Sequence, residues 1–201
     1  MDIQTSLYEG ERIRLGSIDH EKDAEVEARW THDAEYLRLR YLDPVMPTSA
    51  AQLKKRYEAL EKKAEEERNR FLFTIRLRED DRLIGNAQIN WIEWSQGNGE
   101  LELGIGAAED RGRGYGREAL RLLLRFAFRE LNLHRLHVVV AEYNPVALHL
   151  FQRAGFQPEV RRRQALRWDG CRWDLIHLGL LRDEWLEQNG LPGAALAGGR
   201  A

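Results

Sequence analysis

The chain has 201 residues, of which 43% are hydrophobic and 32% charged, and its formal net charge is −2. These values predict one domain with an apolar core, and they exclude a general electrostatic attraction to nucleic acid. No apolar run approaches the roughly 20 residues of a membrane span, and no signal peptide is evident. The single cysteine, Cys171, fits a reducing compartment. We therefore expect a cytoplasmic protein without membrane or nucleic-acid partners.

The first third of the chain is predicted to alternate one short strand with charged helices. Apolar and polar residues alternate over a few positions, and helix-capping residues precede two amphipathic stretches. In chain order we expect a strand at 11–15, a helix from Asp19 to about Trp30, an irregular aromatic segment at 36–47, and a long charged helix capped by Thr48 or Ser49.

The middle of the chain is predicted to form an antiparallel meander of three strands. They lie at 71–77, 82–94 and 100–105, with turns at 79–81 and 96–99. An amphipathic helix then begins near Arg117 and is followed by a Val-rich strand at 137–141. Because such a run is typical of a buried parallel strand, it should pair with the 100–105 strand in a right-handed βαβ unit.

The remaining elements complete one domain at 1–187. We expect a helix at 145–154 and two strands flanking the Asp169-Gly170 turn, and the segment at 181–188 ends the domain. The small, Gly-rich tail at 188–201 is predicted to be disordered. An exposed final strand could pair two chains as a homodimer.

The most informative motif lies between the 100–105 strand and the helix that follows it. It reads Arg111-Gly112-Arg113-Gly114-Tyr115-Gly116. Glycines allow successive backbone N–H groups to face one concavity, partly through positive φ, and the positive end of the helix points there too. The motif therefore predicts a site for a phosphate or pyrophosphate.

Three phosphate-loop patterns compete for this motif. A Walker loop requires Gly-Lys, which the chain lacks. A Rossmann loop requires Gly-x-Gly-x-x-Gly at a strand end, whereas this spacing is Gly-x-Gly-x-Gly. An oxidoreductase of that type, with Glu142 on the ribose, stays a weaker alternative. The pattern Arg/Gln-x-x-Gly-x-Gly/Ala is matched by Arg111, Gly114 and Gly116.

A second block follows one helix and one strand later, with Asn144, then a helix, then Gly155-Phe156. The two blocks in this order resemble the GNAT superfamily of acyl-CoA N-acyltransferases. Segments at 10–15 and 181–185 resemble the branch that includes the ribosomal-protein alanine acetyltransferases, and the resemblance covers roughly 8–187. It implies a mixed α/β fold, with a splayed mixed sheet of about seven strands and helices on both faces.

The resemblance also implies acetyl-CoA as cosubstrate, with its pantetheine arm in the gap of the splayed sheet and its pyrophosphate on the glycine loop. The acetyl group would pass by direct attack in a ternary complex to a primary amine, either a protein N-terminal α-amine or a small molecule. The residues expected to hold the cofactor are Leu103, Ile105, Arg111, Gly112, Arg113, Gly114, Tyr115, Gly116, Arg117, Asn144 and Phe151.

Amine acetylation needs a proton acceptor and donors for the oxyanion. Glu102 lies on the strand beside the thioester and is the first candidate base, although it could instead only orient a cationic substrate; Glu100 and Glu142 are further choices. A kink at Gly104 would free a backbone N–H for the oxyanion. Asn144 completes the expected catalytic set through the family signature.

One position departs from the family pattern. Many members carry a tyrosine four residues before the Gly of the second block, where it protonates the leaving thiolate, and here that residue is Phe151. The acid could be absent, water, Tyr115 or Tyr143. The departure also leaves open a non-catalytic module that only binds acyl-CoA.

No metal site is expected, because His134 and His137 would face opposite sides of a strand. An acceptor pocket would be built from the segment at 30–46, the strand at 91–94 and the hairpin at 168–173, although the tryptophans of these segments could instead belong to the core.

Overall fold

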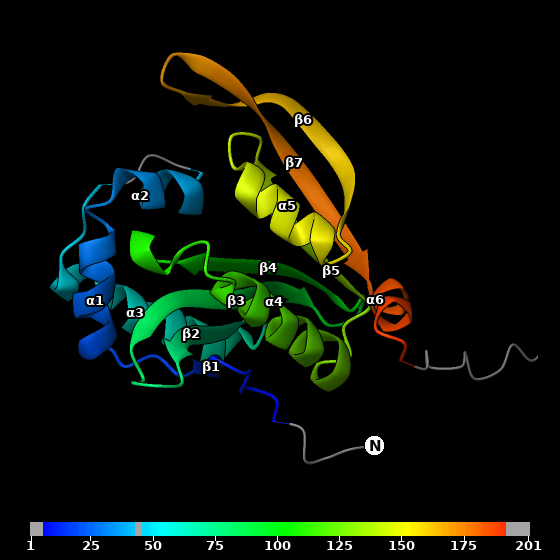
Figure 1. Cartoon of the computed structure of the whole chain (residues 1–201), viewed down its shortest axis with the longest axis horizontal. Coiled ribbons are helices and arrows are strands. Elements are labelled where there is room, and N and C mark those ends of the chain that lie inside the picture. Colours follow the sequence, from blue (N-terminus) through cyan, green and yellow to red (C-terminus); the bar gives the residue numbers. More distant parts are fainter. Residues whose placement is uncertain (1–5, 43–45, 192–201) are drawn as a thin grey trace, which may run out of the picture.

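Seven strands form one sheet in the order β1-β2-β3-β4-β5-β7-β6 (Figure 1). The computed structural model describes residues 6–42 and 46–191, so the predicted tail lies outside it from residue 192 onward. Among the strands of these described ranges, only β4 and β5 run parallel, which confirms the predicted meander and βαβ unit. The strands are β1 (Ile13–Gly16), β2 (Phe71–Leu77), β3 (Leu83–Glu93), β4 (Asn98–Ile105), β5 (Arg135–Ala141), β6 (Gln157–Trp168) and β7 (Cys171–Leu181).

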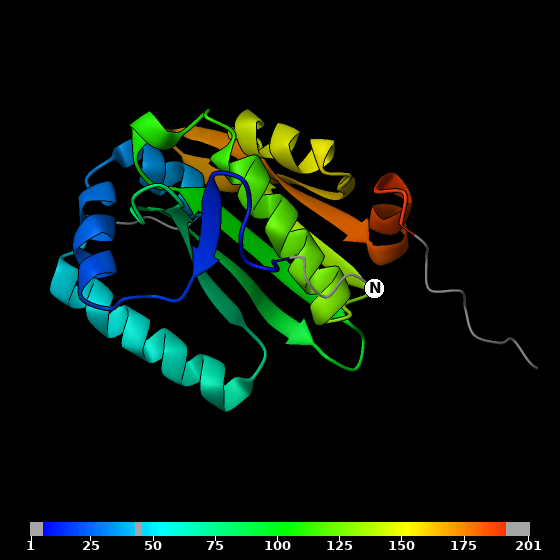
Figure 2. The ribbon, with the colours of Figure 1, turned by 60° about the horizontal axis from the view of Figure 1, so that its bottom comes forward.

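Helices cover both faces of the sheet, and the mixed α/β fold class is thereby confirmed. One face packs against α4 and α5, and the other carries α1, α2 and α3 (Figures 1 and 2). The described helices are α1 (Lys22–Trp30), α2 (Ala34–Arg40), α3 (Ala50–Glu67), α4 (Tyr115–Arg125), α5 (Pro145–Arg153) and α6 (Arg182–Gln188). A π-helical turn, η2 (Phe126–Glu130), extends α4.

Helix α2 is the element that the sequence prediction missed, since 36–47 was expected to be irregular. The Asp33 side chain caps it by accepting hydrogen bonds from the N–H groups of Glu35 and Tyr36 at 2.9 and 3.2 Å. Tyr36 and Leu37 are buried against Trp30, which anchors the helix in a small second core. Packing, rather than length, therefore stabilises this seven-residue helix. By contrast, the predicted cap at Ser49 is confirmed as a capping box with Gln52.

The sheet is open in its centre. Strands β4 and β5 pair only at Asn98–Arg135, Gly99–Leu136 and Glu100–His137. Beyond Glu100, β4 keeps its neighbour β3 as far as Ile105, whereas β5 pairs with β7 instead. Two strand edges thus face each other across a gap, as a splayed sheet requires.

The final strand, β7, is not the exposed edge strand that the sequence analysis predicted. We expected the final strand to be exposed, but β7 lies between β5 and β6, so β6 forms the edge. In Figure 1 the β6–β7 hairpin extends beyond the other strands. Almost every residue of β6 is exposed, and this edge strand pairs with a neighbour, β7, on one side. Pairing of two chains through this edge stays a prediction.

No helix within the described ranges is long and apolar enough to cross a membrane. Cys171 is a free, exposed thiol at the tip of the hairpin. The cytoplasmic location stays a prediction from the sequence.

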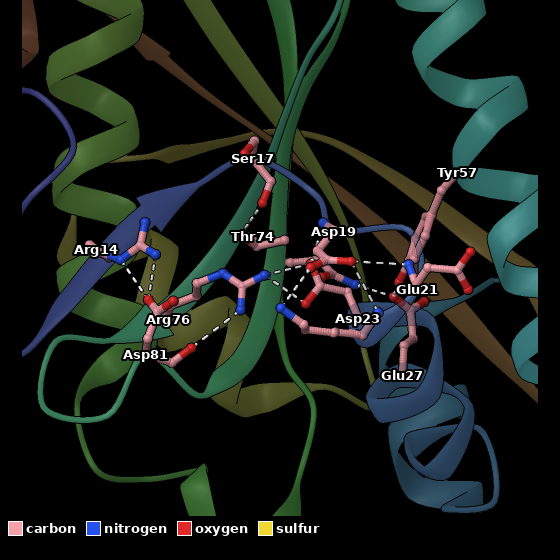
Figure 3. A network of polar contacts seen from close by, with 12 residues as sticks. Arg14, Ser17, Asp19, Glu21, Asp23, Glu27, Tyr57, Thr74, Arg76 and Asp81 are labelled. Atoms are coloured by element: carbon pink, nitrogen blue, oxygen red, sulfur yellow. Dashed lines mark hydrogen bonds and ion pairs between the residues drawn. The ribbon is translucent and has the colours of Figure 1, made fainter.

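A buried ion pair fixes α1 to the sheet (Figure 3). Arg76 on β2 donates to both carboxylate oxygens of Asp23 at 2.6 Å, and Asp23 is only 1% exposed. Nearby, the buried Glu27 carboxylate accepts hydrogen bonds from the Tyr57 hydroxyl and from Asn86. These contacts hold the helices that overlie the open face of the sheet.

Replacing Arg76→Met should lower the free energy of unfolding by about 3–5 kcal/mol, because Asp23 would be left buried without its counter-charge. Arg14→Met provides the control, since it removes an ion pair with Asp81 from an exposed position of the same sheet and should cost no more than about 1 kcal/mol. Urea unfolding of both variants measures the difference. Equal losses of unfolding free energy in the two variants would show that the buried Asp23–Arg76 pair stabilises the protein no more than the exposed Arg14–Asp81 pair does.

Candidate active site

The glycine loop has the backbone shape that its sequence predicts. Gly112 and Gly114 have φ values of +72° and +88°, in the left-handed region that glycine adopts without strain. A Cβ at Gly114 would also lie 3.0 Å from the Arg12 guanidinium. The chain turns here from the 3₁₀ turn η1 (Ala108–Asp110) into the first turn of α4.

The backbone N–H groups of this loop are free for a ligand. Within the part of the chain that the structure describes, the N–H groups of residues 112–117 meet no protein acceptor, and the first to bond back into the helix is that of Glu118, to Gly114. Unpaired N–H groups at a helix N-terminus, with the helix dipole behind them, form an anion site. The geometry therefore suits a phosphate or pyrophosphate.

The side chains of the loop take different directions. Arg111 turns away from the N–H groups toward α2, where it pairs with Asp33 and Glu35 at 2.7 and 2.9 Å. Arg113 is exposed, and its carbonyl oxygen accepts a hydrogen bond from Arg12. The Arg12 guanidinium lies 5.0 Å from the centre of the Tyr115 ring. The loop thus presents backbone, rather than the Arg111 guanidinium, to an anion.

A cavity of about 300 Å³ opens where β4 and β5 separate. Its walls come from β4, β5, the start of α5 and the end of α2. Of the predicted site residues, Glu102, Leu103, Asn144 and Phe151 line it. The loop residues 111–117 and Ile105 do not line the cavity itself.

Glu102 is a carboxylate held by three donors. Arg40 from α2 donates to it at 2.7 Å, Gln88 at 2.9 Å and Asn90 at 3.1 Å. Burial opposes its charge, but the Arg40 guanidinium and the two amides outweigh burial and hold the pKa of this carboxyl below its usual value. Glu102 is therefore ionised at neutral pH, in a form that can accept a proton or attract a cation.

The predicted kink at Gly104 is wrong. Strand β4 pairs with β3 without interruption from Glu100 to Ile105, and the irregularity lies instead near Trp91, whose φ is +51°. The glycine is needed for close approach: a Cβ there would lie 2.9 Å from the Arg40 side chain. Because the N–H of Gly106 donates to β3 and alternate residues point the same way, the Gly104 N–H is also directed to β3. Those of Leu103 and Ile105 point to the open edge.

Asn144 joins two walls of the cavity. Its side-chain oxygen caps α5 by accepting from the N–H of Ala147 at 3.1 Å, and its amide donates to the carbonyl of Leu39 on α2 at 3.3 Å. The neighbouring Tyr143 hydroxyl donates to the Arg38 carbonyl at 3.2 Å. The end of α2 is therefore tied to the end of β5.

The candidate acids differ in position. Phe151 is buried in the cavity wall, with its ring centre 5.4 Å from that of Phe156. Tyr143 lies at the mouth of the cavity, because it precedes the lining residue Asn144 and its hydroxyl bonds to the lining residue Arg38. Burial raises the pKa of its hydroxyl. Tyr115 is outside the cavity, beside Arg12. Of the two tyrosines, only Tyr143 is close to the cavity.

Arg40 is the site residue that the sequence prediction missed. The available signal was Asp33 followed by Glu35, an N-cap with an acidic first turn, which indicates a short helix. Trp91 and Trp94 were expected near an acceptor pocket, but both are about half exposed at the far end of β3, beside α3. Trp168 and Trp173 do reach the mouth, where both rings contact Tyr143.

Glu142 and the histidines have other neighbours. The Glu142 carboxylate pairs with Arg161 at the base of the hairpin. His137 lies 3.6 Å from Glu100. Over residues 6–42 and 46–191, no group of three His, Cys, Asp or Glu side chains has a geometry that could hold a metal ion.

Comparison with known proteins agrees with this geometry. A sequence model described as the acetyltransferase (GNAT) domain matches residues 12–157. The chain is 28% identical over 177 residues to an uncharacterised N-acetyltransferase, p20, of Bacillus licheniformis, covering 87% of this chain and 96% of p20. It is 34% identical over 107 residues to YdaF of Bacillus subtilis, a putative ribosomal N-acetyltransferase, covering 53% of this chain and 57% of YdaF.

The fold is shared with a solved structure as well. A spermidine N-acetyltransferase from Vibrio cholerae, in complex with CoA and spermine, superposes with a TM-score of 0.74 at 23% identity, over 87% of this chain and 98% of that one.

Proposed function

This chain belongs to the GNAT family of acetyltransferases, and from that premise we propose how it moves an acetyl group from acetyl-CoA to a primary amine. Family membership removes the Rossmann oxidoreductase as an alternative. The observation that carries the proposal is that two features occur together at the end of β4. One is the loop of unpaired N–H groups at residues 112–117, and the other is the cavity between β4 and β5.

The pyrophosphate of acetyl-CoA would bind to the N–H groups of the loop, with Arg117 in the first turn of α4 adding positive charge. The pantetheine arm would lie along the open edge of β4 and pair with the backbone of Leu103 and Ile105, whose N–H groups face the gap. The same free edge can supply a donor to the oxyanion, a role that we move from Gly104 to its neighbours.

The acceptor amine would bind beside Glu102. This carboxylate would attract the ammonium and take its proton, directly or through water. The amine nitrogen then attacks the acetyl carbonyl carbon, and the carbonyl electrons move to the oxygen to form a tetrahedral oxyanion. When the carbonyl re-forms, the carbon–sulfur bond breaks, the CoA thiolate leaves, and the second proton of the nitrogen passes to the thiolate or to water. Asn144 and Phe151 shape the wall, and Asn144 also fixes α2 beside the reacting groups.

The acceptor is either a protein N-terminal α-amine or a small amine such as a polyamine. The similar proteins include a putative ribosomal N-acetyltransferase and a spermidine N-acetyltransferase, which supports this choice of amines. An amine panel that contains spermidine, dipeptides and their N-blocked forms would test this, with release of the CoA thiol as readout. The second candidate, a module that only binds acyl-CoA, is motivated by Phe151. CoA binding without thiol release on any amine would favour it.

Phe151 gives a direct test of how the thiolate leaves. If no tyrosine acid is needed, Phe151→Leu should cost about 1–3 kcal/mol of stability through lost packing and should hardly change the single-turnover rate. A free thiol has a pKa near 8.5, so the thiolate is a tolerable leaving group. Phe151→Tyr should then accelerate the chemical step, because its hydroxyl would point into the cavity.

Rapid-quench single-turnover rates of the three proteins check this expectation. A large loss of chemistry in well-folded Phe151→Leu, with CoA binding intact, would mean instead that Phe151 positions the pantetheine arm.

A further inference from the structure

The first residue of the glycine loop is clamped to α2. The Arg111 guanidinium bonds to the carboxylates of Asp33 and Glu35 and also donates to the carbonyl oxygens of Ile105 and Gly106. Asp33 is the N-cap of α2, so the clamp holds the beginning of this helix. One side chain therefore joins the end of β4, the start of the loop and the start of α2.

A layer of apolar contacts supports the same junction. Trp30, Tyr36 and Leu83 form a buried cluster with Ala107 packed against it. The ring of Trp30 lies directly on Gly106, where an added Cβ would come within 2.1 Å of it. Any shift at the start of the loop would thus be transmitted to the α1–α2 corner, because close-packed contacts of this kind do not deform freely.

The other end of α2 lies over the cavity. Arg40 reaches Glu102 at 2.7 Å, and the carbonyl groups of Arg38 and Leu39 accept hydrogen bonds from Tyr143 and Asn144. Helix α2 therefore spans from the anion loop at one end to Glu102 at the other.

We propose that Arg111 is a positioning residue that couples occupancy of the anion loop to the placement of α2 over the acceptor cavity. The inference rests on the proposed site for acetyl-CoA. When the loop closes on the pyrophosphate, Arg111 fixes Asp33, and α2 in turn holds Arg40 against Glu102. Four of the five N–H groups of the guanidinium already donate to protein oxygens, so we assign the phosphate to the backbone N–H groups of the loop and not to this side chain.

Hydrogen exchange with CoA as the probe tests this coupling. In the wild-type protein, saturating CoA should slow amide exchange across residues 34–41 by at least about tenfold, since ordering α2 raises its local opening free energy. In Arg111→Gln this CoA-dependent protection should fall below about twofold, while calorimetry should find the Kd of CoA within about threefold of wild type, because the loop N–H groups remain.

Two further variants separate the loss of the Arg111–Asp33 contact from a general loss of stability. Arg82→Gln is the matched control. It weakens a two-bond pair with Asp110, the residue before Arg111, and among the described residues Arg82 makes no hydrogen bond or ion pair with α2, so the protection should persist. Asp33→Asn retains an N-cap side chain while removing the charge that Arg111 holds, so it should lose protection as Arg111→Gln does.

Two results would overturn the inference. One is a loss of CoA affinity in Arg111→Gln of more than about tenfold, which would identify the guanidinium as a phosphate ligand. The other is unchanged α2 protection in that variant. A wild-type protein that fails to bind CoA would contradict the proposed cofactor site itself, whereas CoA binding with no response in α2 contradicts only the coupling.

Discussion

Gly114→Val should raise the Kd of CoA by at least about a hundredfold, close to 2.7 kcal/mol of binding free energy. Gly114 has a φ of +88°, which a β-branched residue adopts only with strain. Its new side chain would also meet the Arg12 guanidinium 3.0 Å away. The loop would have to rearrange, and its N–H groups would no longer face one point.

Calorimetric titration with CoA measures this effect, and circular dichroism shows whether the variant is folded. Arg113→Ala is the control in the same loop. Its side chain is exposed, and only its carbonyl oxygen contacts Arg12, so affinity should change by no more than about threefold. Folded Gly114→Val that binds CoA like the wild type would remove the loop from the cofactor site.

Glu102→Gln should lower kcat by about 10²–10⁴, the usual contribution of general acid–base catalysis, and leave acetyl-CoA affinity nearly unchanged. The amide has nearly the shape of the carboxylate but cannot take a proton from an ammonium. It also removes the charge that faces Arg40 at 2.7 Å. A role limited to orienting a cationic substrate predicts a raised KM with a smaller change in kcat.

Steady-state kinetics over a pH series separates the two roles. Glu100→Gln is the matched control, because Glu100 lies on the same strand and face one step further from the loop and is paired with His137 rather than with Arg40. Its effect on kcat should be much smaller. Unchanged turnover and an unchanged pH–rate profile in Glu102→Gln would exclude Glu102 from both roles.

Local rules were sufficient for most of the fold. The strand at 71–77 and the parallel strand after α4 follow from the pattern of apolar residues, and Ser49 and Gly155 mark helix ends by their own chemistry. Helix α2 could not be found this way, because its seven residues are stabilised by contacts with distant segments. The kink expected at Gly104 failed for a similar reason: the glycine accommodates Arg40, which belongs to that unrecognised helix.

In the candidate site, too, the features set by local sequence were predictable and those set by tertiary contacts were not. The loop was predictable because a positive φ is a property of Gly112 and Gly114 themselves. The direction of Arg111 was not, because its carboxylate partners lie 76 and 78 positions earlier in the chain. The family motif predicts an arginine at this position, but only the tertiary structure shows which oxygens it contacts.

The gap between β4 and β5 has a consequence for the protein before it binds its cosubstrate. Most proteins keep unpaired strand edges at the rim of a sheet and protect them with charge, proline or bulges. Here β4 beyond Glu100 leaves such an edge in the middle of the sheet, flanked by Leu101 and Leu103. The pantetheine arm would then cover this edge as an additional strand does. Binding of acetyl-CoA would therefore protect the protein from aggregation through β4, in addition to supplying the acetyl group.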